Sequence, residues 1–342
     1  MFLAALLACT ATRDDDATRV DSGGAARPSR VDLCDALDAS ELAEATAMPT
    51  GTLDQAATLG LRRARPHRPG GHAFSWGLVD PARDGHRDWT FPDAAVAEVQ
   101  ARGLQVVATL GNGLRRQADA EVMELSVPDA QREGWLAFVA DLAERYDGDG
   151  VADMPGLDGG VVAWEVGNEP SCDVDDDVCA EAFVTLTDTT VATLRAHAPG
   201  AEVYPAGAAL PLLLDGSGRE NARLVLPWTS WLAAGDSSAV DGLSVHLAVG
   251  VTTPSPEEAL AWWREHAPGM RLLVGELGAS GPGGVPRVAE DPTAEANWLG
   301  EALATSFAMG AERVAWCAAR NDLAGMPEVR EVLRQAAETY PE

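Results

Sequence analysis

Two glutamates in this 342-residue sequence stand at the ends of short apolar runs. Glu169 follows residues 161–166 in a Gly-Asn-Glu-Pro turn, and Glu276 follows residues 272–275. A carboxylate in such a position is costly unless it is paired or reactive. Apolar runs of this kind are typical of buried parallel strands, and catalytic groups of α/β barrels lie at the carboxyl ends of such strands. Two carboxylates so placed suit glycoside hydrolysis, in which one donates a proton and the other attacks the anomeric carbon.

The residues around both glutamates resemble a known family. Residues 164–170 (WEVGNEP) are similar to the fourth-strand motif of the retaining glycoside hydrolases of clan A, the (β/α)8 group that includes families 5 and 39. Residues 273–278 (LVGELG) are similar to the seventh-strand motif of that clan. The resemblance spans roughly residues 45–320 and is specific for the clan rather than for one family. It therefore implies no particular substrate.

The resemblance implies a role for each matching residue. Glu169 would be the general acid/base, Asn168 would bind the sugar 2-hydroxyl, and Glu276 would be the nucleophile. Trp316 matches the aromatic residue under the cleaved sugar. Trp76 lies in the matching loop after the second strand, where aromatic rings stack on sugars, although it could equally be a packing residue.

Two further matches concern the positioning of the nucleophile. Arg65 stands where the clan has an arginine that hydrogen-bonds the nucleophile, and the alternative is one surface arginine among three neighbours. His246 matches the histidine of the clan's sixth-strand His-x-Tyr motif, but residue 248 is alanine. The missing tyrosine leaves open how Glu276 is positioned. The alternative for His246 is a core histidine with satisfied hydrogen bonds.

The implied double displacement sets two requirements on the carboxylates. The two carboxyl groups must lie about 5–5.5 Å apart so that one can attack carbon directly. The pKa of Glu169 should be raised, because a neighbouring carboxylate and an aromatic pocket disfavour its charged form.

The elements that must position these residues alternate between strand and helix. Apolar runs predict strands at residues 61–66, 104–110, 161–166, 201–210, 240–247, 271–278 and 313–318, after a first strand within residues 41–48. Helical periodicity and glycine stops predict helices at residues 54–60, 93–102, 135–146, 183–198, 228–234, 257–266, 293–309 and 323–338. This order predicts an α/β fold, a single-domain (β/α)8 TIM barrel, for which the chain is long enough.

The charge of the chain limits its partners. The formal net charge is −28, and all 25 basic residues are arginine. Such a surface repels nucleic acid and anionic membranes, so neither is expected as a partner. We expect a monomer that binds a polysaccharide or oligosaccharide and needs no cofactor for catalysis.

The N-terminal residues predict export. Residues 1–8 are almost wholly apolar and lead into Leu6-Leu7-Ala8-Cys9, which resembles a bacterial lipobox with Cys9 as the lipidated residue. The stretch has no basic n-region, so the alternative is a false signal. We expect residues 1–9 to be a lipoprotein signal, residues 10–35 a flexible acidic tether, and residues 36–342 the catalytic domain. The expected location is the cell envelope or the medium.

The other four cysteines divide into two groups. Cys172 and Cys179 bracket an acidic loop after the Glu169 strand and are expected to form a disulfide in an exported protein. Cys34 has no evident partner. Cys317 lies in an apolar run and is expected to be a small core residue.

An acidic loop precedes the Glu169 strand. Asp147, Asp149 and Asp153 alternate with glycines, as in calcium loops of the Asp-x-Asp-Gly type, where oxygen ligands sit on a sharply turning backbone. The full EF-hand pattern is absent. A structural calcium site and a plain acidic turn are equally compatible with this spacing.

Three other functions fit parts of the sequence. A lipoprotein barrel that binds glycans without cutting them is one alternative, favoured by the missing tyrosine after His246 and by the unusual exit of the third strand. A transglycosylase would use the same carboxylate pair with a different acceptor. A metal-dependent hydrolase is disfavoured because the strand ends offer one histidine and no His-x-His pair. The expectation that the linkage is β rests on its frequency in the clan.

Overall fold

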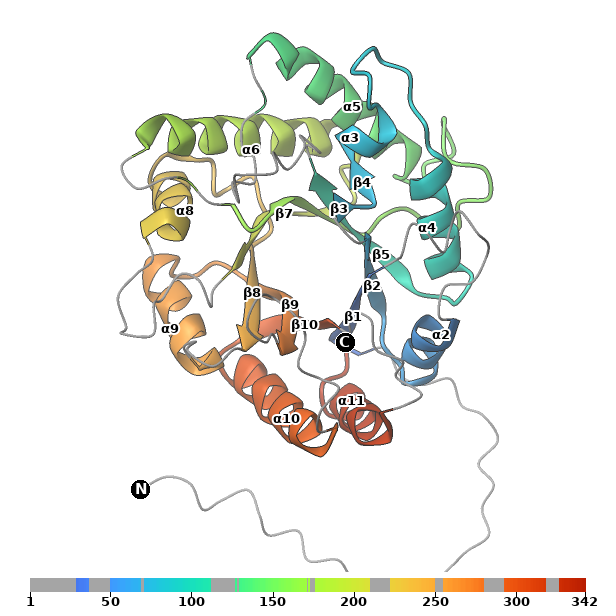
Figure 1. Cartoon of the computed structure of the whole chain (residues 1–342), viewed down its shortest axis with the longest axis vertical. Helices are drawn as coiled ribbons and strands as arrows, with labels where there is room; N and C mark the ends of the chain where they lie inside the picture. The colour runs from blue at the N-terminus through green and yellow to red at the C-terminus, as the bar shows by residue number, and fades with distance from the viewer. Residues whose placement is uncertain are drawn as a thin grey trace, which may run out of the picture.

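The computed structural model describes residues 29–36, 50–68, 71–111, 127, 129–170, 172, 176–209, 222–249, 255–279, 292–317 and 326–342. Within these residues, eight parallel strands close into a barrel that is ringed by helices (Figure 1). The barrel strands are β1 (Val31–Ala36), β2 (Arg63–Arg68), β5 (Gln105–Gly111), β6 (Ala163–Asn168), β7 (Glu202–Ala209), β8 (Leu243–Val249), β9 (Leu272–Ala279) and β10 (Ala311–Cys317). The predicted (β/α)8 barrel is confirmed.

The strands follow the chain order around the barrel. β1 lies between β2 and β10, and a parallel pairing of β2 with β5 closes the cylinder. Two short strands extend the sheet at its rim: β3 (Gly71–His72) pairs with β2, and β4 (Phe74–Ser75) pairs with β5. The carboxyl ends of all eight barrel strands therefore meet at one rim, as parallel pairing requires.

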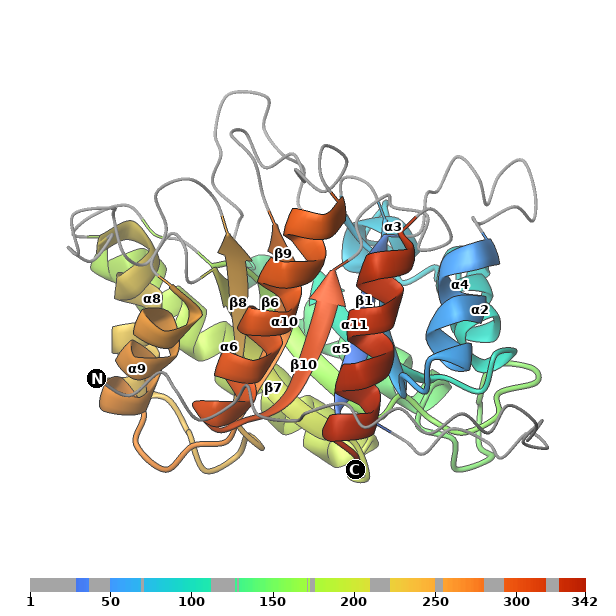
Figure 2. The ribbon, with the colours of Figure 1, turned by 90° about the horizontal axis from the view of Figure 1, so that it is seen from below.

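The helices form the outer layer, as the side view in Figure 2 also shows. They are α2 (Thr50–Thr58), α3 (Trp76–Val79), α4 (Thr90–Gln100), the 3-10 turn η1 (Asp129–Gln131), α5 (Arg132–Arg145), α6 (Asp177–His197), α8 (Ala222–Ala234), α9 (Pro256–His266), α10 (Pro292–Ala308) and α11 (Pro327–Thr339). Each predicted helix is present, with ends shifted by a few residues. Such shifts are expected because helix ends are the part of the pattern that periodicity specifies least.

Apolar side chains fill both faces of the barrel strands. Outward-facing residues such as Leu272 and Val274 belong to the large core between the strands and the helices. A smaller cluster, which includes Val107, Tyr204 and Leu273, fills the barrel interior. Because both faces are buried, the strands are read in sequence as nearly continuous apolar runs.

The first strand corrects the sequence analysis. The first strand is β1 (Val31–Ala36) and not a segment within residues 41–48. Residues 37–49, which include that segment, lie outside the described part. Residues 31–35 therefore belong to the barrel and not to a tether. Asp32 is buried in β1 and binds Arg313 of β10 through two hydrogen bonds of 2.7 Å. This polar residue interrupts the apolar run and hides the strand from the hydrophobic pattern.

The disulfides confirm one expectation and correct another. Cys172 and Cys179 are bridged, as predicted. Cys34 and Cys317 are bridged to each other, so Cys317 is not a free core thiol. The two are in register on the neighbouring strands β1 and β10, which brings together residues 283 apart in sequence.

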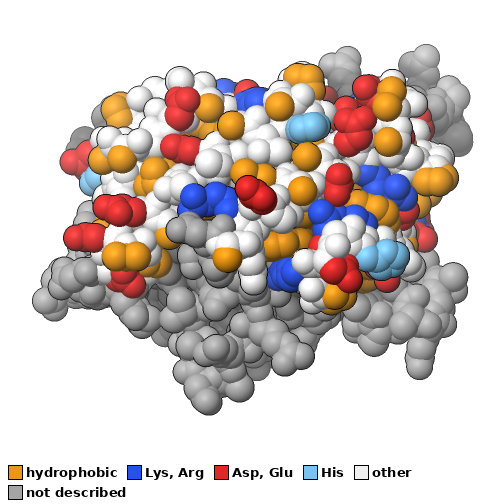
Figure 3. Space-filling model, turned by 90° about the horizontal axis from the view of Figure 1, so that it is seen from above, with side chains coloured by type: hydrophobic (Ala, Val, Ile, Leu, Met, Phe, Trp, Pro, Cys, Tyr) orange, Lys and Arg blue, Asp and Glu red, His pale blue; other side chains and the backbone are white. Residues whose placement is uncertain are grey.

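The remaining N-terminal predictions concern residues outside the described part. The signal segment, Cys9 and most of the acidic tether lie within residues 1–28. None of the described helices combines the length and the apolar character needed to cross a bilayer. On the face of the molecule shown in Figure 3, acidic and basic side chains are interspersed.

Candidate active site

A β-bulge turns Glu276 into the barrel. Leu273 and Gly275 of β9 both face the interior cavity, so regular alternation would point Glu276 outward. The register between β8 and β9 shifts at this point: Val245 is opposite Val274, but His246 is opposite Glu276. The extra residue re-aims Glu276 towards the interior. A Cβ at position 275 would clash with Ser244 and lie 2.6 Å from Oε1 of Glu165, so only glycine fits there.

Glu169 is fixed by a sharp turn at the end of β6. Its φ of +48° is in the left-handed region, which is uncommon for a residue other than glycine. Its backbone N–H donates a 2.7 Å hydrogen bond to the carbonyl of Gly207 on β7. Strained backbone of this kind persists where surrounding contacts hold it, and it concentrates at functional sites.

The two predicted carboxylates converge on His246. The Nδ1 atom of His246 lies 3.1 Å from Oε1 of Glu169 and 3.6 Å from Oε1 of Glu276. One oxygen of each carboxylate and a ring nitrogen of His246 all lie within 4.8 Å of one another. The other side of the ring packs against Gly207, where a Cβ would clash with Nε2. The three residues therefore form one compact ionisable group at the carboxyl rim of the barrel.

Arg65 connects the rest of the site. Its side chain is 2% exposed, so it is not a surface arginine. Nη1 donates to Glu276, Nε donates to Glu165, and Nη2 donates a 2.8 Å hydrogen bond to Oδ1 of Asn168. Arg65 thus fixes a predicted nucleophile, a predicted sugar-binding amide and a third carboxylate with one planar fork.

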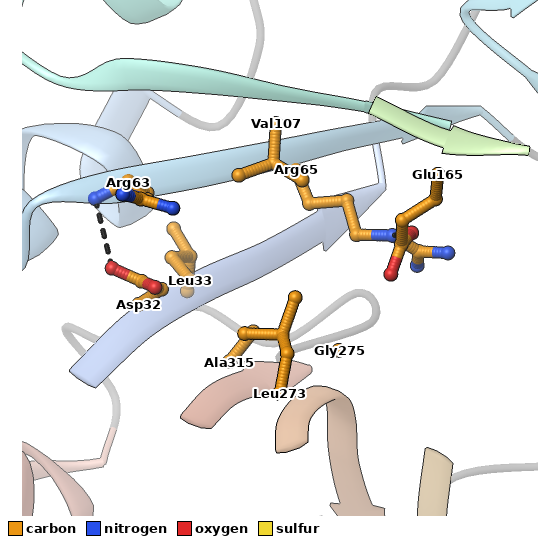
Figure 4. A pocket seen from close by; sticks show the side chains of 9 residues that line it. All are labelled: Asp32, Leu33, Arg63, Arg65, Val107, Glu165, Leu273, Gly275 and Ala315. Atoms are coloured by element: carbon orange, nitrogen blue, oxygen red, sulfur yellow. Dashed lines mark hydrogen bonds and ion pairs between the residues drawn. The ribbon is translucent and has the colours of Figure 1, made fainter. Parts of the chain in front are cut away.

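Glu165 is the functional residue that sequence reasoning missed. Its side chain is fully buried on β6, and Figure 4 shows the side chain of Arg65 reaching across the interior to it. It also accepts hydrogen bonds from Oγ1 of Thr109, at 2.8 Å, and from Oγ of Ser244. Burial acts to raise the pKa of Glu165, but the charges of Arg65 and His246 and these hydrogen bonds outweigh it and hold the pKa below its ordinary value. A glutamate four residues before Glu169, inside an apolar strand, was the available signal.

The pKa expected for Glu169 is not what the structure shows. Burial acts to raise it, but the hydrogen bond from His246 and the positive charges of His246 and Arg65 prevail, so the pKa of Glu169 is lowered. For His246, burial acts to lower the pKa, but the charge of Glu276 and the hydrogen bond to Glu169 raise it above 6.5. The sequence pattern could not show that the imidazole of His246 lies close to both carboxylates. The ionisation of His246 and that of Glu169 are therefore coupled.

This pair predicts a pH dependence of stability. A raised pKa for His246 stabilises the folded protein below pH 6.5, and this contribution is lost as the pH rises through the folded-state value. The lowered pKa of Glu169 contributes above pH 4.5 and is lost as the pH falls. We therefore expect the difference in Tm between wild type and His246→Asn to be largest between about pH 4.5 and 6.5 and to shrink towards pH 9.

The measurement is thermal unfolding across this pH range. His197→Asn is the control, because His197 is 42% exposed with its Nδ1 3.9 Å from Glu144, and we expect its difference in Tm to stay nearly constant with pH. A His246→Asn difference that is equally constant would show that no charged imidazole stabilises the site.

Two predicted aromatic contacts are corrected by the structure. Trp76 is 1% exposed and packs against Trp135 and Phe138, with Arg83 over its ring, so the packing alternative holds. Trp316 is fully buried. Its neighbour Ala315 faces the barrel interior, so Trp316 points outward to the helix layer by strand alternation. Neither ring reaches the carboxylates.

The acidic loop brings together the three predicted aspartates. Oxygen atoms of Asp147, Asp149 and Asp153 lie within 4.8 Å of one another. Backbone N–H groups of the loop donate to all three, including Gly150 to Asp153 at 2.8 Å. Burial, and then repulsion by neighbouring carboxylates, raises the pKa of Asp147. The loop leads into β6 and is separate from the carboxylate site.

Comparison with solved structures gives the same fold. An endo-β-1,4-mannanase from Thermotoga petrophila has a TM-score of 0.61 at 13% identity, covering 93% of this chain and 78% of its own. A family 10 endo-β-1,4-xylanase from Gloeophyllum trabeum has a TM-score of 0.58 at 15% identity, covering 91% and 98%. Cel5A from Thermotoga maritima, solved with cellobiose, has a TM-score of 0.58 at 15% identity, covering 89% and 96%. No protein-family model and no curated protein matches the sequence.

Proposed function

We propose that this protein is a retaining glycoside hydrolase. The observation that carries the proposal is the carboxylate pair: oxygens of Glu169 and Glu276 lie within 4.8 Å of each other at the carboxyl rim of a closed barrel. Retaining enzymes hold the two carboxyl groups about 5–5.5 Å apart, whereas inverting enzymes need about 6.5–9.5 Å to admit a water. The solved structures of similar fold, which include glycosidases by their names, support the same reaction class.

The proposed reaction has two displacements. Glu169, in its protonated form, gives its proton to the glycosidic oxygen while a Glu276 oxygen attacks the anomeric carbon, and the bond to the leaving group breaks. Glu169 then takes a proton from water, whose oxygen attacks the same carbon and releases Glu276. Arg65 holds Glu276 aimed for attack, because it donates directly to that carboxylate.

Asn168 is proposed to bind the sugar 2-hydroxyl. Arg65 donates to its Oδ1 atom at 2.8 Å, which fixes the amide orientation and leaves the NH₂ group as the donor for substrate. A hydrogen bond at the 2-hydroxyl strengthens in the transition state of glycoside cleavage. His246 remains in the proposed site as the partner of Glu169, whereas Trp76 and Trp316 are removed from it.

The proposed substrate is a β-linked polysaccharide or oligosaccharide. The similar structures are named for β-1,4-mannan and β-1,4-xylan, which makes these polymers, together with β-glucan, the first to test. The decisive experiment is incubation with activated 2-deoxy-2-fluoro glycosides, followed by mass spectrometry of peptides. We expect one glycosyl adduct on Glu276, and Glu276→Gln should stay unlabelled. Hydrolysis products of the polymers, sized by chromatography, would then give the sugar and the mode of attack.

The same experiment separates the alternatives. A glycan-binding barrel would retain polysaccharide without forming an adduct or releasing product. A transglycosylase would form the adduct but give longer oligosaccharides when acceptor sugar is added. Absence of both adduct and hydrolysis across these sugars would overturn the proposed function.

We also propose that the protein is an exported monomer anchored by lipid at Cys9. The lipobox-like segment carries this proposal, and two disulfides are compatible with an oxidising compartment. We expect the protein expressed from its full gene in a bacterium to sediment with membranes and to extract with detergent. Cys9→Ser should move it to the soluble fraction. A Cys9→Ser protein that remains in the membranes would contradict the anchor.

We propose that Asp147, Asp149 and Asp153 bind a structural calcium ion. A cation would relieve the repulsion that raises the pKa of Asp147, and binding to the folded state alone stabilises it by about 2.7 kcal/mol at a hundredfold excess over Kd. We expect chelator to lower Tm by several degrees and calcium to restore it, measured by thermal unfolding. Asp149→Ala should melt like the chelated protein and ignore calcium. Equal Tm of wild type in chelator and in millimolar calcium would show a plain acidic turn.

A further inference from the structure

The Cys34–Cys317 disulfide lies inside the candidate site. Sulfur atoms of both cysteines and an oxygen of Glu276 are all within 4.8 Å of one another. Cys34 is also in contact with the arginine that binds Glu276, because Nη1 of Arg65 is 3.7 Å from its Sγ atom. The disulfide therefore lies beside both members of the Arg65–Glu276 ion pair, in contact with Arg65 and within 4.8 Å of a Glu276 oxygen.

Strand register explains this placement. Cys34 of β1 is opposite Arg65 on β2 and opposite Cys317 on β10, and β10 is next to β9, which carries Glu276. Going around the rim, the four adjacent strands thus present Glu276, Cys317, Cys34 and Arg65. An ion pair joins the outer two of these residues, Glu276 and Arg65.

We propose that the Cys34–Cys317 disulfide is a positioning element for the nucleophile, which holds the guanidinium of Arg65 and the carboxylate of Glu276 in the geometry for attack. This rests on the proposed function. It also answers how Glu276 is aimed although Ala248 stands at the tyrosine position of the His-x-Tyr motif. A covalent bond between β1 and β10 fixes the seam where the first and last barrel strands meet. Two free thiols in its place would let that seam and the Arg65 side chain relax.

The kinetic test uses the second disulfide as the matched control. We expect Cys34→Ser/Cys317→Ser to lower kcat for an activated aryl glycoside about 10- to 100-fold, because small misplacement of a reacting group has effects of this size, with KM changed much less. Cys172→Ser/Cys179→Ser should keep kcat within about twofold, since that bridge joins two residues only seven apart in sequence, the second of them in α6, and neither belongs to the four adjacent strands β9, β10, β1 and β2. Assays are run well below the Tm of each variant. A folded Cys34→Ser/Cys317→Ser variant with the kcat of wild type would overturn the proposal.

Reversible reduction covers the case in which the double serine variant does not fold. In the Cys172→Ser/Cys179→Ser background, Cys34–Cys317 is the only disulfide left among the described residues. Reductant should lower kcat while the near-ultraviolet circular dichroism spectrum stays native. Reoxidation should remove the two free thiols again and restore kcat. Unchanged kcat after complete reduction of the folded protein counts against the proposal.

A readout independent of turnover keeps the two proposals apart. The Arg65 guanidinium resonance in ¹⁵N spectra, assigned by its absence from Arg65→Met, should shift and exchange faster with solvent after reduction. If oxidised wild type cleaves no glycoside, the proposed function fails, and the resonance still decides whether the disulfide holds Arg65. A resonance that reduction leaves unchanged would show that it does not.

Discussion

Glu276→Ala is expected to lower kcat for an activated aryl glycoside by about 10⁴-fold or more, a loss of about 5.4 kcal/mol in transition-state stabilisation. In the proposed mechanism the variant lacks the oxygen that forms the bond to the anomeric carbon, so no covalent intermediate can form. Arg65 keeps its contacts with Glu165 and Asn168 in this variant, and the barrel should stay folded. Activity, circular dichroism and Tm are measured on the same preparation.

Azide makes this prediction specific for the nucleophile. In Glu276→Ala, azide can occupy the space of the missing carboxylate and attack the anomeric carbon once, so the glycosyl azide should have inverted configuration. In Glu169→Ala the nucleophile is intact, and a good leaving group needs no acid. Azide should then attack the covalent intermediate and give a product with retained configuration. Proton NMR of the anomeric position distinguishes the two, and the opposite pattern would exchange the roles of Glu169 and Glu276.

Arg65→Met is expected to destabilise the fold by about 3–5 kcal/mol at neutral pH, because it leaves Glu165 as an uncompensated charge in the barrel interior. Arg65 and Glu165 are 2% and 0% exposed, so solvent screens this pair very little. Adding Glu165→Gln removes the stranded charge. Arg65→Met/Glu165→Gln should therefore recover most of the stability but not the activity, since Glu276 and Asn168 still lack their donor. Denaturant unfolding gives the stability and aryl glycoside hydrolysis gives kcat.

The control and the pH dependence sharpen this prediction. Arg63 lies two residues earlier on the same strand, and its Nη1 atom is 2.6 Å from Oε2 of Glu202, which is not part of the carboxylate site. Arg63→Met should therefore cost less stability and leave kcat nearly unchanged. In wild type the lowered pKa of Glu165 contributes stability above pH 4.5 that is lost as the pH falls. Without Arg65, burial raises that pKa, so the deficit of Arg65→Met should grow from pH 4.5 to pH 7. A deficit independent of pH would mean that lost packing, not the stranded charge, destabilises the variant.

The sequence by itself determined the architecture and indicated the proposed catalytic pair. Seven of the barrel strands were visible because both of their faces are buried, which makes their apolar runs continuous, and helical periodicity marked the outer layer. Glu169 and Glu276 stood out because a carboxylate in an apolar run is expensive. β1 was missed for the converse reason, since Asp32 interrupts its run and is compensated by a partner far along the chain.

Only the tertiary structure decided how the site is held. Arg65 reaches Glu165, Glu276 and Asn168 because strands distant in sequence meet at one rim, and no local pattern encodes which inward positions face each other. The bulge at Gly275 turns Glu276 inward, whereas simple alternation turns Trp316 outward. The pairing of Cys34 with Cys317 likewise depends on barrel closure, which places the first strand beside the last. Residue types specify locally which chemistry is possible, but strand register and barrel closure specify which residues meet in one site.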